Sequence, residues 1–96
     1  MMPSPDLERF ATLIADNVVS TFERDRDGAP FHPTMRVTVV SVLVRSLLLV
    51  LPTAFSEALA AACNRGLDDV VGAIGIGGPR VEAVDPDDGS VTMRAA

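Results

Sequence analysis

The run from Val37 to Leu51 constrains the fold of this chain more than any other segment. Wound as a helix, it carries apolar side chains on all but a narrow strip of its surface, and such a helix has to be covered on nearly every side. A chain of 96 residues has few elements to cover it, because a domain this small buries only about 60 to 65 % of its unfolded surface. The sequence therefore predicts contact with a second copy, a partner protein or, less favourably, a membrane.

The same run also contains many β-branched residues, which suit a strand as well as a helix. An α+β fold with residues 36–44 as a strand is therefore the alternative. Length favours the helix, since the apolar run continues to Leu51 without a turn signal and exceeds the usual strand of about 5 to 6 residues. We expect a helix over residues 34–51. Its polar strip stacks on one face and comprises Thr34, Thr38, Ser41 and Arg45.

Two further helices are indicated on either side of this run. Ser4 and Pro5 mark a helix start, and apolar residues then recur at helical spacing to Phe22, which predicts an amphipathic helix over residues 5–24. After Pro52 a second apolar stripe leads to a stop at Gly66, with a short turn capped by Asp68 beyond it. One kinked rod over the second and third segments is the alternative to two helices.

The remainder of the chain predicts a glycine-rich loop and a β-hairpin. Residues 72–78 contain four glycines, and no lysine stands nearby to reach a phosphate. Arg80–Val84 and Ser90–Arg94 flank a turn of Pro, Asp and Gly. The expected fold is mainly α, with three helices and a small C-terminal β-hairpin, in a single domain over residues 1–96.

The net charge of −5 argues against direct nucleic-acid binding, which needs clustered basic residues. It favours a partner protein with a basic surface. The carboxylates predicted to meet such a partner are Asp68, Asp69, Asp85, Asp87 and Asp88. The last three of these superficially match a calcium loop, but a twelfth-position Glu is missing and a plain hairpin turn is expected.

No catalytic, cofactor-binding or metal-ligating group is predicted. A nucleophilic pair could be formed only by His32 and Cys63, each the single residue of its type. We expect His32 in a loop and Cys63 as a small buried thiol in a helix. A lone cysteine and the lack of an N-terminal signal pattern favour a cytoplasmic location.

The sequence thus predicts a non-enzymatic, acidic interaction module that forms a homo-oligomer, with a homodimer expected. Residues predicted to form the interface are Val37, Val40, Leu43, Val44, Leu47, Leu48 and Leu51. Arg45, on the polar strip, is expected to pair with Asp16 or Glu23 within the same chain. The alternatives are a phage-encoded inhibitor of a host defence complex, of the anti-CRISPR type, which would block a basic groove, and a small membrane-associated protein.

Overall fold

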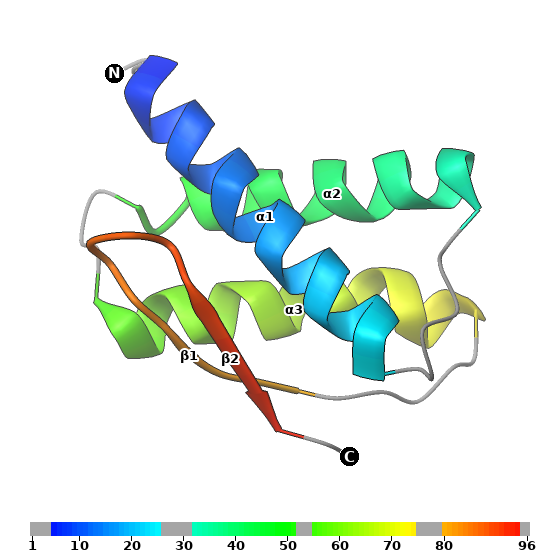
Figure 1. Cartoon of the computed structure of the whole chain (residues 1–96). Coiled ribbons are helices and arrows are strands. Elements are labelled where there is room, and N and C mark those ends of the chain that lie inside the picture. Colours follow the sequence, from blue (N-terminus) through cyan, green and yellow to red (C-terminus); the bar gives the residue numbers. More distant parts are fainter. Residues whose placement is uncertain (1–4, 26–31, 52–54, 75–79, 95–96) are drawn as a thin grey trace.

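The computed structural model describes residues 5–25, 32–51, 55–74 and 80–94 (Figure 1). These residues form helices α1 (Pro5–Asp25), α2 (Pro33–Leu48) and α3 (Ser56–Ile74), followed by strands β1 (Arg80–Val84) and β2 (Val91–Arg94). The prediction of a mainly α fold with a C-terminal hairpin is confirmed. The alternative of a strand at residues 36–44 is wrong, because these residues lie within α2.

Helix α2 packs against both α1 and α3, and the hairpin bridges these two helices, with β1 on α3 and β2 on α1. Figure 1 shows α1 crossing α2 obliquely, while α3 runs back beside α2 in the opposite direction. The core lies between these elements. Its largest fully buried side chains are Phe22, Ile14, Leu43, Leu47, Leu59, Val18, Val19, Val39, Val84 and Cys63.

Helix α1 follows the sequence pattern closely. Acidic Asp6 and Glu8 lie in its first turn, where the helix dipole favours negative charge. Its apolar positions form one buried stripe, as predicted from their spacing. The stripe comprises Ala11, Ile14, Ala15, Val18, Val19 and Phe22.

Helix α2 is shorter than predicted. It begins at Pro33 and ends at Leu48, so the expected end at Leu51 is wrong. Beyond Leu48, the Leu49 N–H donates to Ser46 O at 3.3 Å and the Val50 N–H donates to Leu47 O at 3.0 Å, both at the tighter three-residue spacing, while the Leu51 N–H donates to Leu47 O at 2.9 Å. Pro52 disfavours helical geometry at Leu51, so the helix does not continue beyond this turn. Helices α2 and α3 are separate and lie side by side, so the kinked-rod alternative is wrong.

Helix α3 continues through the predicted stop at Gly66 and ends at Ile74. The predictions of a helix end at Gly66 and of a short turn capped by Asp68 are therefore both wrong. Gly66 is buried against α2, where an added Cβ would lie 2.9 Å from Leu43 Cδ2 and 3.4 Å from Leu43 Cα. The glycine lets two helix backbones approach closely, and its local signal for a helix end is overridden by this packing. Gly72 is also helical, and residues 75–79 lie outside the described residues.

The hairpin is antiparallel and contains an irregularity between Val81 and Ala83. Residues three apart in a regular strand point to opposite faces, but the extra residue of this bulge puts Val81 and Val84 on the same, buried face. The turn is closed by Gly89, whose φ is +75°. Its N–H donates to Asp85 O at 2.9 Å. The predicted hairpin and its turn are confirmed.

Candidate protein-interaction surface

The structure divides the predicted interface residues of α2 between two environments. Leu43, Leu47 and Leu51 are enclosed by the core of the single subunit, with at most 3 % of their surface exposed. These three serve folding, so the premise that one copy cannot shelter them is wrong. By contrast, Val37 is 66 % exposed. The residues of the predicted interface that are not enclosed by the core are Val37, Val40, Val44 and Leu48.

Most of the remaining residues line a pocket together with residues of α1. Val40, Val44 and Leu48 are half-buried there, one to three helical turns beyond Val37 on a common face. We call Val37, Val40, Val44 and Leu48 the open flank of α2.

A groove of about 410 Å³ opens between the open flank and α1. It is lined by Glu8, Thr12, Val40, Ser41, Val44, Arg45 and Leu48. The α1 wall consists of Glu8 and Thr12, which lie one turn apart and are joined by the Thr12 hydroxyl donating to Glu8 O at 2.9 Å. These two positions carry polar side chains where a core contact would need apolar ones, and the valines of α2 are only partly covered here.

At the other end of the α1–α2 contact, Arg36 holds the helices together. Its guanidinium donates to Asp16 Oδ1 at 3.2 Å and lies 3.8 Å from Glu23 Oε1. The predicted pairing of Arg45 with these two carboxylates is wrong. Since the helices run in opposite senses, the second half of α1 meets the start of α2, and Arg45 lies nine residues further along, opposite Glu8 in the groove.

The polar strip predicted for α2 is exposed as a whole. Thr34, Thr38, Ser41 and Arg45 all lie at the surface. The Thr38 hydroxyl donates to Thr34 O at 3.1 Å, within its own helix. Ser41 and Arg45 form part of the groove, which places a small polar side chain and a cation among the valines of the open flank.

The five carboxylates predicted to bind a basic partner do not form one surface. Asp68 accepts two hydrogen bonds from the Arg80 guanidinium, which lower the pKa of this carboxyl and tie α3 to the start of β1. Asp69 is exposed beside it. Asp85, Asp87 and Asp88 lie at the opposite end of the hairpin, in its turn.

Two of the turn carboxylates bind their own backbone. Asp85 Oδ1 accepts from the Asp87 N–H and Asp88 Oδ1 accepts from the Ser90 N–H, both at 2.8 Å. The Ser90 N–H also lowers the pKa of Asp88. These bonds explain the acidic residues as turn-formers. A basic partner protein, and with it the inhibitor alternative, stays a prediction.

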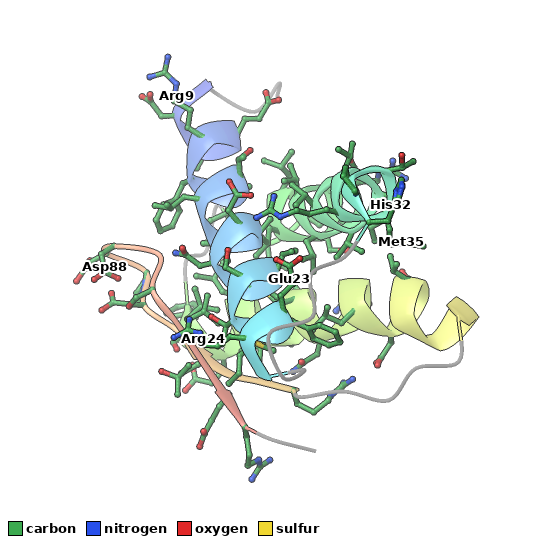
Figure 2. All side chains as sticks on the ribbon, turned by 45° about the vertical axis from the view of Figure 1, so that its right-hand side comes forward. Arg9, Glu23, Arg24, His32, Met35 and Asp88 are labelled. Carbon is green, nitrogen blue, oxygen red and sulfur yellow. The ribbon has the colours of Figure 1, made fainter. Side chains whose placement is uncertain are left out.

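His32 and Cys63 have structural roles. His32 is the N-cap of α2, and its Nδ1 accepts from the Thr34 N–H at 3.3 Å. Figure 2 shows it at the start of α2, well separated from Asp88 at the hairpin turn. Cys63 is fully buried in α3, and burial raises the pKa of its thiol to about 12. A thiol with that pKa stays protonated at neutral pH and is a poor nucleophile.

Among the described residues, no three side chains of His, Cys, Asp or Glu are grouped so that they could hold a metal ion. Over the same residues, no helix combines the length and the apolar character that crossing a bilayer requires.

Residues that the sequence analysis missed include Asn64 and Thr12. The Asn64 side-chain amide donates to Val81 O at 3.0 Å and accepts from the Val81 N–H at 2.8 Å, as a neighbouring strand would. In the sequence, Asn64 stands two residues before the helix end predicted at Gly66. Nothing in its local sequence indicates a partner 17 residues away. Thr12 lies on the polar face of α1 and shows no sequence signal of a groove.

Comparison of the chain with protein-family models, with characterised proteins and with solved structures finds no match.

Proposed function

We propose that this protein is a non-enzymatic interaction module that self-associates through the open flank of α2. The observation that carries the proposal is a row of aliphatic side chains along one helix face, one exposed and three half-buried, beside an open groove. Val37 is 66 % exposed, and Val40, Val44 and Leu48 are half-buried along the same face. Fully burying an exposed side chain of this kind contributes roughly 1.5 to 3 kcal/mol. Val37 has most of this contribution to gain, and the three half-buried residues have part of it, which favours a covered state.

The proposal includes a cytoplasmic location. Cys63 is a free, buried thiol, and reduced cysteines are typical of cytosolic proteins.

Sedimentation equilibrium tests self-association directly. The wild-type chain is expected to show a mass above the 10.1 kDa of one copy. Val37→Asp places a charge on the open flank at an exposed position, so it should leave the fold intact and return the mass to that of one copy. A wild-type mass of one copy at every loading concentration would overturn the proposal.

Phe55→Asp is the matched control. Phe55 is also 66 % exposed, but it precedes α3 and lies outside the open flank. The Phe55→Asp variant should associate as the wild type does. Loss of association in both variants would show that exposed apolar surface in general, and no particular face, drives it.

A further inference from the structure

We propose that His32 is a pH-sensitive cap of α2, which holds the first turn of the helix in place while its imidazole is neutral and releases it on protonation. The turn under this control comprises residues 33–36, and its last residue, Arg36, also joins α2 to α1. The inference goes beyond the proposed self-association, since it concerns the folding of a single copy.

The start of α2 depends on His32 for two hydrogen bonds. The imidazole Nδ1 accepts from the Thr34 N–H at 3.3 Å, and the carbonyl oxygen of His32 accepts from the Arg36 N–H at 2.9 Å. Pro33, between them in the chain, has no N–H to satisfy. The first turn contains no acidic residue that would balance the positive end of the helix dipole, so His32 supplies the side-chain cap.

Protonation removes this cap. A neutral imidazole offers one nitrogen as an acceptor, whereas an imidazolium donates from both nitrogens and accepts at neither. Protonation also brings a positive charge to the end of the helix where the dipole disfavours one. The common cap residues serine, threonine and asparagine accept a hydrogen bond at any pH. A histidine at this position therefore makes the start of α2 dependent on pH.

The neighbouring elements do not compensate for the charge. The charged residues that α1 and α3 carry alongside the first half of α2 are Asp16, Glu23, Arg24, Asp68 and Asp69. Arg36 binds Asp16 and Glu23, and Arg80 binds Asp68, while Asp69 is exposed to solvent. The ion pairs among the described residues do not include His32. A protonated His32 therefore gains no ion pair there in exchange for the lost cap.

The first turn of α2 has little else to hold it. Pro33 and Thr34 are exposed, and the first fully buried residue of the helix is Val39. Loss of the cap is therefore expected to loosen the turn without unfolding the helix beyond Val39. Because the guanidinium of Arg36 donates to Asp16 Oδ1 at 3.2 Å, loosening of this turn also releases the contact between α1 and α2 at this end.

Thermal unfolding at pH 8 and pH 5.5 tests the inference. Histidine ordinarily changes charge between about pH 5 and 8, and the chain contains one histidine. His32→Asn keeps a cap that does not titrate, whereas His32→Ala has none. Both should fold, since His32 is exposed. At pH 8 the wild-type Tm should match that of His32→Asn and lie about 4 to 8 °C above that of His32→Ala.

At pH 5.5 the wild-type Tm should fall to that of His32→Ala. His32→Asn retains every other titrating group of the chain, so its change between the two pH values is the baseline. Low protein concentration keeps association from contributing. A wild-type Tm that changes with pH as His32→Asn does would overturn the inference.

Amide hydrogen exchange places the effect within the chain. The protection factor of the Arg36 amide should fall by about fivefold from pH 8 to pH 5.5 in the wild type, which is the size expected for a lost cap, and should stay constant in His32→Asn. The Cys63 amide, in the middle of α3, is the internal control. An equal fall at Arg36 and Cys63 would show a general loss of stability and would contradict a switch at the start of α2.

Self-association should respond to the same switch, because Val37 of the open flank directly follows this turn. Acidification from pH 8 to pH 5.5 is expected to weaken association of the wild type and not of His32→Asn. This expectation rests on the proposed function. A wild-type mass of one copy at both pH values would overturn the proposed function, whereas the unfolding and exchange measurements decide the inference about His32.

Discussion

Helix α2 has two neighbours, and it meets them in different ways. On the α3 side the contact is closed. Gly66 allows close approach at Leu43, while α3 also holds the hairpin through Asn64 and through Asp68, which binds Arg80. On the α1 side the helices are joined at one end by Arg36 and leave a groove at the other.

This difference teaches that aliphatic content alone does not decide which face of a helix becomes core. Both faces of α2 carry Val or Leu at helical spacing. The α3 side closes because Gly66 lets the α3 backbone approach Leu43 of α2. The groove on the α1 side stays open because Glu8 and Thr12 stand where apolar side chains would be needed.

The largest expected effect on stability comes from shortening one side chain on the closed face of α2, with one on its exposed face for comparison. Leu47→Ala opens a cavity in the closed side and should lower the free energy of unfolding by about 2 to 5 kcal/mol. Val37→Ala, at the exposed face, should change it by less than about 0.5 kcal/mol. Urea denaturation at low protein concentration measures both without a contribution from association. Equal losses would remove the distinction between the two faces.

Enlarging Gly66 tests why the α3 side is closed. Gly66→Val forces a branched side chain against Leu43 and should destabilise the fold by about 1 to 3 kcal/mol. Gly66→Ala should cost much less. The clash at 2.9 Å involves the flexible end of Leu43, and alanine gains about 1 kcal/mol of helix propensity over glycine. Thermal unfolding of the two variants compares them, and a Gly66→Val variant as stable as wild type would refute close approach.

Removal of the Asn64 amide should loosen the hairpin. Asn64→Ala leaves the part-buried Val81 N–H and C=O without their partner, at a cost of about 1 to 3 kcal/mol, and should speed amide hydrogen exchange at Val81. Asn17→Ala is the control, since it removes a single hydrogen bond, from its side-chain amide to Gly89 O. Unchanged exchange at Val81 in Asn64→Ala would show that β1 is held by packing alone.

The smallest effect is the pH dependence of the bond between Asp68 and Arg80. The pKa of Asp68 is lowered in the folded chain by the hydrogen bonds from Arg80. Its contribution to stability is therefore present above the ordinary aspartate pKa of about 3.9 and is lost as the pH falls through the lowered value. The melting temperature of Asp68→Asn should lie slightly below wild type at neutral pH and approach it in strong acid. A difference independent of pH would exclude the carboxylate as its cause.

Much of the fold could be predicted because its signals are local. The repeat of apolar residues to Phe22 defines α1, and the turn residues Asp85, Pro86 and Gly89 define the hairpin. The failures concern residues whose roles depend on distant partners. Gly66 carries every local sign of a helix end, and only Leu43 across the helix interface explains why the helix continues. For the candidate surface, the choice of α2 followed from the sequence, but its inner and outer residues could not be told apart.

The sequence by itself determined the order and type of the elements and the apolar character of α2, because propensity and periodicity act within a few turns of the chain. Only the tertiary structure decided that Leu43 and Leu47 belong to the core and Val37 to the surface. It also decided that Arg36, not Arg45, bridges to α1. The reason is that burial and ion pairing depend on which neighbour a face meets, and that depends on the crossing of helices far apart along the chain.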